Sequence, residues 1–334
     1  MIAKCLFGLI GFAVLSAVLC VAGAVATYYL QGETMAMGLL RAWVFDFDGI
    51  LVGAFGFGLL WFVRSSGNVV LAQLQNVLEL PDSAAVTLVA LHRRTRSWAY
   101  SAIISVPLTL VGGVALWNCH FPLSGFARAY LATCTISIYF VAASIGAFFL
   151  FTMAEFLFLE RQMDHSSKDR LRMKADASPL DLDSIDSFFV LSATVGVIAI
   201  YLGFRGTLTG SFRDTPEVFR QLLVLPVLLF LPATLCYSLY PRMVLRKIAN
   251  NDMLYRIQEL EALASTANPQ APKERLEFRK LVLEVKEKIY SDTRMGPLLT
   301  FKDTLALTMS LVIVIQFILQ HDKTVVGFLK SLLN

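Results

Sequence analysis

The feature that most constrains this sequence is a series of long apolar runs that carry almost no charge. They cover residues 5–30, 42–63, 98–117, 129–159, 188–204, 218–240 and 305–319. A helix rises about 1.5 Å per residue, so about 20 residues bridge the roughly 30 Å hydrocarbon core of a membrane. Because lipid offers no hydrogen-bond partner to backbone groups, such runs favour continuous helices, and they lack the polar alternation of a membrane β-barrel. The sequence therefore predicts an all-α integral membrane protein with about seven transmembrane helices.

Charged residues make up 16% of the 334 residues, compared with about 25% in soluble domains. They gather between the apolar runs, and the loops after the second and fourth runs and before the last run are rich in lysine and arginine. Membrane proteins concentrate such residues on the cytosolic side, which explains the net charge of +4 without nucleic acid as a partner. We therefore expect a multi-pass protein of the bacterial inner (plasma) membrane, with a cytosolic N-terminus and the C-terminus outside.

Three regions follow from this pattern. Residues 1–240 are expected to form a six-span bundle, which includes amphipathic cytosolic loop helices at 65–97 and a basic loop at 160–186. Residues 241–297 are expected to form a cytosolic αα-hairpin between the last two spans, because two charged amphipathic stretches are joined there by a short proline-containing loop. Residues 298–334 contain the seventh span and a short outer tail.

The first apolar run has two interpretations. A basic residue, Lys4, precedes it and the small residues Ala24 to Ala26 lie near its end, so residues 1–26 resemble a cleavable signal peptide. Its apolar core is longer than the roughly 7–15 residues of such a signal, which favours a retained membrane anchor.

Asp46 and Asp48 are the most conspicuous polar pair, at the expected outer end of the second span. Ionisable groups at membrane depth are costly and often mark ion paths, so this pair is a candidate outer mouth. The alternative is that the two carboxylates cap the helix end, where negative charge suits the helix dipole. The glycines that follow, which suit close helix packing, are Gly49, Gly53, Gly56 and Gly58.

Three residues of later spans are further candidates. Glu155, at the inner end of the fourth span, is either a bundle-facing charge that pairs with a basic loop residue or an interfacial side chain. Pro226 and Pro232 in the sixth span are a candidate hinge, because proline frees a backbone carbonyl and bends a helix. Proline is also common in membrane helices without any role in gating.

The second arm of the expected hairpin carries an apolar stripe at helical spacing. Its members are Phe278, Leu281, Val282, Val285 and Ile289. The first arm carries a narrower seam, which comprises Met253, Ile257, Leu260 and Ala264. The stripe either packs within the hairpin or serves as a face for another subunit or a soluble partner, since a hairpin of this size has little core of its own.

The sequence contains no phosphate-binding loop and no zinc-protease or serine-hydrolase motif. Its four histidines fall in separate segments without the spacing of metal ligands, so we expect neither an enzyme nor a bound cofactor or metal. The bilayer and further copies of the chain are the expected partners. Our leading hypothesis is a homo-oligomeric channel or pore-type protein controlled through the hairpin. The alternative is a membrane anchor or scaffold subunit that binds a soluble cytosolic partner in a transport, secretion or defence complex.

Overall fold

The structure, a computed structural model, describes residues 2–46, 48–117, 123–163, 171–174, 179–208, 217–266 and 272–293, with Thr308 and Val312. Over these residues the chain is almost wholly helical, as predicted, and adds one short two-stranded ribbon. The elements are α1 (Ile2–Gln31), α2 (Glu33–Arg41), a π-helix (Ala42–Asp46), α3 (Gly49–Val77), β1 (Leu78–Glu79), α4 (Asp82–Thr95), α5 (Trp98–Trp117), α6 (Gly125–Gln162), β2 (Arg172–Met173), α7 (Pro179–Leu208), α8 (Glu217–Thr266) and α9 (Pro272–Thr293). Apart from Thr308 and Val312, the expected seventh span and outer tail lie outside the described residues.

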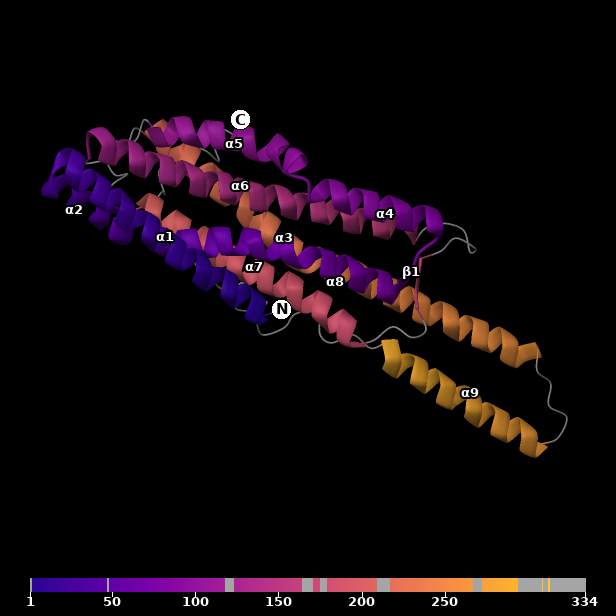
Figure 1. Cartoon of the computed structure of the whole chain (residues 1–334). Coiled ribbons are helices and arrows are strands. Elements are labelled where there is room, and N and C mark those ends of the chain that lie inside the picture. Colours follow the sequence, from indigo (N-terminus) through magenta and orange to yellow (C-terminus); the bar gives the residue numbers. More distant parts are fainter. Residues whose placement is uncertain are drawn as a thin grey trace.

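Five of the described helices are long and apolar enough to cross a membrane. These helices or segments are Ile2–Gln31, Gly49–Val77, Trp98–Ala115, Gly125–Gln162 and Ser184–Gly203. They lie along one another in an elongated bundle, in which α1 packs on α3, α3 on α7, and α6 on both α5 and α8 (Figure 1). The helical class and the membrane-length helices confirm the coarse prediction, whereas the number of spans remains a prediction.

The second apolar run is broken where the sequence predicted a continuous helix from residue 42. Gly32, with φ of 88°, turns the chain so that α2 packs back along α1. A π-helix follows, and Asp48, with φ of 47°, adopts the left-handed conformation before α3 begins at Gly49. Single π-helical turns are rare and frequently occur at functional sites.

Helix α3 does not end at Arg64, where the apolar run ends. The first part of the predicted loop-helix region at 65–97 is instead the continuation of α3 to Val77. Its apolar face, which includes Val70 and Leu74, is buried against the bundle, so tertiary packing carries the helix through the polar stretch after Arg64. The second part of that region forms the separate helix α4, with Pro81 at its N-cap position.

Helix α8 is likewise longer than predicted. A boundary was expected between residues 240 and 241, yet the helix runs unbroken through Pro226, Pro232 and Pro241. Tyr237 and Arg242, which flank Pro241, are both fully buried in the bundle. Their packing compensates for the hydrogen bond that proline removes, which is why the membrane run and the first charged stretch form one helix.

Aromatic side chains fill the core between α3, α6, α7 and α8. The rings of Phe149 and Tyr237 stack with centroids 3.9 Å apart, and Phe156 meets Phe189 edge to face at 5.3 Å. Phe62 of α3 is completely buried beside Phe188. These contacts leave the centre of this group of helices filled with side chains rather than hollow.

The two-stranded ribbon connects distant parts of the chain at the polar end of the bundle. Leu78 pairs with Met173, and Glu79 pairs with Arg172, in antiparallel register. The carbonyl oxygen of Met173 also accepts a hydrogen bond of 2.6 Å from Arg256 of α8. The ribbon therefore ties the end of α3 to the part of α8 that follows the apolar run.

Candidate functional site

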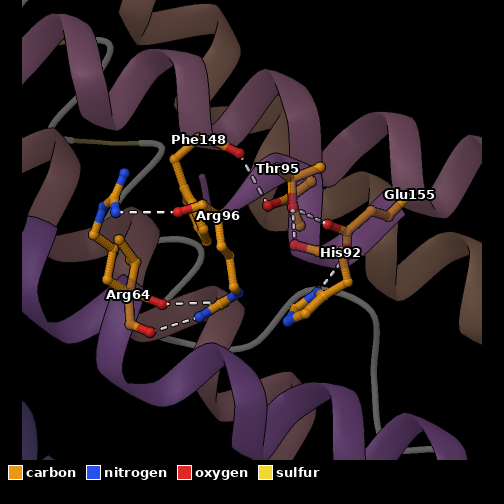
Figure 2. Close-up of polar contacts among 8 residues, drawn as sticks. Arg64, His92, Thr95, Arg96, Phe148 and Glu155 are labelled. Atoms are coloured by element: carbon orange, nitrogen blue, oxygen red, sulfur yellow. Dashed lines mark hydrogen bonds and ion pairs between the residues drawn. The ribbon is translucent and has the colours of Figure 1, made fainter. Parts of the chain in front are cut away.

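A cluster of buried and half-buried polar side chains joins α3, α4 and α6 near the polar end of the bundle (Figure 2). We call it the interhelical polar cluster, and it comprises Arg64, His92, Thr95, Arg96 and Glu155. Arg64 belongs to α3 and Glu155 to α6, whereas the other three residues lie in α4 or directly after it. Residues at i and i+3 share a helix face, so His92 and Thr95 both reach α6.

The Glu155 carboxylate forms hydrogen bonds with two side chains of α4. It is 4% exposed, and its Oε2 lies 3.1 Å from Nδ1 of His92. The hydroxyl of Thr95 donates to Oε1 of Glu155 and also lies 2.9 Å from the carbonyl oxygen of His92. Figure 2 shows the carboxylate held between these two side chains. Glu155 therefore faces the bundle, as one of the two interpretations predicted, and its partners among the described residues are His92 and Thr95 of α4.

Arg64 and Arg96 each donate to the backbone of the other. Nη1 of Arg96 lies 2.6 Å from the carbonyl oxygen of Arg64, and Nη1 of Arg64 lies 3.1 Å from that of Arg96. Arg96 also donates to the carbonyl oxygen of Val63 at 3.2 Å, and Arg64 to the hydroxyl of Ser101 at 3.3 Å. Burial lowers the pKa of Arg96, and the nearby charge of Glu155 opposes this shift.

The guanidinium group of Arg96 requires a glycine on the neighbouring helix. A Cβ atom at Gly67 would lie 1.0 Å from Nη2 of Arg96, so no other residue fits while the arginine keeps its place. Each cation of this region also lies over an aromatic ring. Arg64 is 3.4 Å from the ring centroid of Trp98, and Arg96 is 5.3 Å from that of Phe148. Such contacts contribute about 0.5–2 kcal/mol each.

The imidazole of His92 has one nitrogen, Nε2, that is buried and without a hydrogen-bond partner among the described residues. A histidine with a carboxylate at Nδ1 is oriented to exchange a proton or bind a metal through Nε2. The described part of the chain, however, holds no group of three metal-ligating side chains. The arrangement is therefore best suited to cross-linking three helices through charge-assisted hydrogen bonds.

Sequence reasoning missed His92, Thr95, Arg96 and Gly67 as members of one site. His92 was considered only for metal-ligand spacing, and Arg96 only as a cytosolic positive charge. The available signal was the position of both arginines next to the apolar runs, where charged side chains must find partners as the helices pack.

The structure places Asp48 at the break between the π-helix and α3. It occupies the N-cap position of α3, at the helix end where the capping interpretation expected a negative charge, although its side chain makes no capping hydrogen bond. The break packs on α1, because the hydroxyl of Ser16 donates to the carbonyl oxygen of Gly49 at 3.0 Å. The side chain of Asp46 lies outside the described residues. A role of either carboxylate in an ion path stays a prediction.

The remaining predicted residues lie on α8 and α9. The helix continues through Pro226 and Pro232 without a break, although the side chain of Pro226 is outside the described part. In the apolar stripe of α9, Leu281 is 56% exposed and Val285 is 37% exposed. The other members are Phe278 and Val282, which are half-buried, and Ile289, whose side chain is not described.

Buried and exposed ion pairs hold α8 where it leaves the aromatic core. Arg242, with its side chain 1% exposed, pairs with Asp186 of α7. One turn further on, the exposed Lys247 lies 2.8 Å from Glu160 of α6. Within α8, Arg256 pairs with Asp252 at 2.7 Å. Burial raises the pKa of Asp252, and this arginine opposes the shift.

No protein-family model matches the chain, and comparisons with curated proteins and with solved structures give no significant match. The residues and their geometry are therefore the basis for inferring function.

Proposed function

We propose that this protein is a multi-pass membrane anchor whose projecting arm binds a soluble cytosolic protein. The arm consists of residues 241–266 of α8 together with α9. The observation that carries the proposal is that α8 forms one helix of 50 residues from the apolar bundle to the tip of the arm. At about 1.5 Å per residue, this helix is about 75 Å long, so the arm extends well past the membrane-length helices.

The base of the arm is fixed to the bundle, as a rigid mount for a partner requires. Arg242 and Lys247 of α8 pair with acidic residues of α7 and α6, respectively. Arg256 also donates to the ribbon strand β2. Position and orientation of the arm are therefore coupled to the packing of the apolar helices.

The arm presents large apolar side chains to solvent. The clearest cases are Leu254 at 52% exposure, Leu263 at 63%, Leu281 at 56% and Leu283 at 66%. Leu281 and Val285 lie one turn apart on the same face of α9 and are both exposed, and adjoining exposed apolar side chains mark a surface that another protein covers. Helices with apolar positions at i, i+3 and i+4 commonly bind in a groove or beside a partner helix.

Photo-cross-linking in intact cells tests this proposal. We expect a cross-linkable amino acid at Leu281 or Leu263 to capture a different soluble protein, whereas one at Lys280, on an exposed polar position of α9, captures much less. Leu281→Asp should abolish the complex and leave folding intact, because the side chain is exposed. Cross-links that join only copies of this chain would contradict the proposal.

The proposal retains the predicted topology of seven spans, with the N-terminus in the cytosol, the C-terminus outside and residues 241–297 in the cytosol. Single cysteines at Lys168 and Gln270 should resist an impermeant thiol reagent in intact cells, whereas one at Asp214 should react. Labelling at Gln270 from outside would place the arm on the wrong side for a cytosolic partner.

A homo-oligomeric channel is the second candidate, and the broken segment before α3 favours it. Interrupted helices form ion sites in many membrane proteins, because unwound backbone and carboxylates can face the ion. Since aromatic rings fill the core of the protomer, the path would run between protomers. The double substitution of Asp46 and Asp48 by Asn should then lower cation flux through protein in liposomes, and lower it less at high salt. Unchanged flux and selectivity would exclude this role for the two carboxylates.

A further inference from the structure

An open cleft of about 880 Å³ lies between α1, α3, α5 and α6. This volume is within the range of about 300–1,000 Å³ that is usual for ligand pockets. The lining is apolar along most of its length, with side chains that include Phe12, Phe57, Leu60, Phe140 and Val141. All four helices contain segments of membrane-crossing length, so the cleft opens between elements that lipid would surround.

Positive charge gathers at one end of this cleft. Arg64 and Ser65 belong to its lining, and Nζ of Lys4 donates to the carbonyl oxygen of Ser65 at 3.1 Å. No carboxylate among the described residues lies within ion-pair distance of Lys4 or Arg64. Nε of Arg64 is also buried without a hydrogen-bond partner in this part of the chain.

The tryptophans place this charged end at a membrane interface. Trp61 and Trp98 both line the cleft, and they lie beside Lys4 and Arg64. Helix α5 starts at Trp98 and has 20 residues, a length of about 30 Å that matches the hydrocarbon core. Tryptophan and basic side chains gather where the hydrocarbon ends, so the cleft extends from one interface into the membrane.

We propose that this cleft binds an anionic phospholipid from the leaflet on the Arg64 side. Its phosphate pairs with Arg64 and Lys4, which supplies the negative charge that the described residues do not provide. An acyl chain lies along the apolar wall between α1 and α6. A phospholipid fits both ends of the cleft. Its anionic head group suits the basic end, as in other basic pockets between membrane helices, and its acyl chain suits the apolar wall.

Fluorescence quenching by brominated lipid tests the proposal on the full chain. The substitutions Trp43→Phe and Trp117→Phe leave Trp61 and Trp98, which both line the cleft, as the fluorophores. We expect phosphatidylglycerol with brominated chains to quench several-fold more than brominated phosphatidylcholine at the same mole fraction in mixed vesicles. Equal quenching by both lipids would overturn the proposal.

Two exposed positions of α6 provide a matched pair of steric variants. Ser137 lines the cleft and Thr133, one turn earlier, does not. Both hydroxyls bond only to carbonyl oxygens of their own helix, so neither substitution breaks a contact between helices. Ser137→Phe should remove the preference for phosphatidylglycerol, whereas Thr133→Phe should retain it.

The charge variant is Lys4→Gln, because Arg64 also holds the backbone of Arg96. It should reduce the preference for phosphatidylglycerol, whereas Arg41→Gln, in α2, should not. An unchanged preference in both Ser137→Phe and Lys4→Gln would overturn the proposal. A second result would also overturn it: a dimer, detected by sedimentation, in which neither brominated lipid quenches Trp61 and Trp98. A second copy of the chain would then occupy the cleft.

Discussion

The two halves of α3 pack on their neighbours by opposite means. In the first half, Gly53 and Gly58 bring the helix so close to α1 that an added Cβ would lie 2.8 Å from Oγ of Ser16 or 3.1 Å from Cα of Leu9. We call this contact the glycine-packed region. In the second half, Gly67 instead admits the guanidinium group of Arg96, next to Glu155 and the aromatic core. We call this second contact, together with the buried Arg242 of α8 and its pair with Asp186, the charge-packed region.

The difference shows what each environment allows. Helices in lipid gain little from burying apolar side chains against each other, so close backbone approach through small residues stabilises them. Towards the polar end, buried charges are tolerated only when each has several hydrogen bonds, and these bonds have strict geometry. The glycine-packed region should therefore tolerate change better than the charge-packed region, and the following variants test that expectation.

The largest effect is expected from Arg242→Met, in the charge-packed region. The variant removes the buried guanidinium group and its pair with Asp186, whose carboxylate is 31% exposed, so we expect a cost at the lower end of the roughly 3–5 kcal/mol for breaking a buried pair. Unfolding of purified protein in detergent and denaturant measures this cost. Lys247→Met is the control, because the Lys247 side chain is 51% exposed and its loss should cost at most about 1 kcal/mol. Equal costs would mean that burial does not set the strength of these pairs.

Gly67→Ala should follow, with a loss of about 3 kcal/mol. The new methyl group cannot coexist with Arg96, whose guanidinium group would lose its bonds to the backbone of α3. Gly56→Ala, in the same helix, is the matched control, since its nearest new contact would be an ordinary 3.6 Å from Cγ1 of Val141. A thermal unfolding temperature that falls in the control as much as in Gly67→Ala would contradict the specific role of Gly67.

Glu155→Gln should cost about 1–3 kcal/mol. The amide keeps the shape of the carboxylate, but it has one oxygen and no charge, whereas the carboxylate uses two oxygens to accept hydrogen bonds from His92 and Thr95. The same unfolding assay applies, with Glu160→Gln as the comparison at a more exposed acidic residue of α6. If both variants unfold alike, the interhelical polar cluster does not depend on the charge of Glu155.

The smallest effect is expected from Gly58→Ala, in the glycine-packed region. Crowding against the backbone of Leu9 opposes folding, but alanine has a higher helix propensity than glycine by about 1 kcal/mol. The net cost should therefore be about 1 kcal/mol. A cost as large as that of Gly67→Ala would remove the distinction between the two regions.

The membrane-length helices were predictable because hydrophobicity and length act locally along the chain. Helix α5 begins and ends at the predicted residues, Trp98 and Trp117, since aromatic side chains favour the interfaces. The close packing of Gly53 and Gly58 was also predicted correctly, because small residues in an apolar helix have few other roles.

The continuity of α3 and α8 could not be predicted from local pattern. Polar residues after Arg64 and a proline at position 241 are ordinary signals for the end of a helix. Tertiary contacts override these signals, because Arg96 packs at Gly67 and Arg242 is buried in the bundle. Such contacts form between separate segments of the chain, so a local pattern does not reveal them. The interhelical polar cluster was missed for the same reason, since Glu155 and His92 meet only after α4 has packed on α6.

The ribbon between β1 and β2 has a consequence for the order in which the chain assembles. Its first strand follows α3 directly, whereas its second strand is synthesised only after α4, α5 and α6. At about 5–20 residues per second, the ribosome needs seconds to supply that partner. During this time α3 has α1 beside it, and Arg96 is available to cover Gly67, but Glu155 of α6 and the second strand are still missing. The glycine contacts with α1 are therefore the first to hold the new helix in place, and α6 later brings the Glu155 carboxylate that completes the cluster.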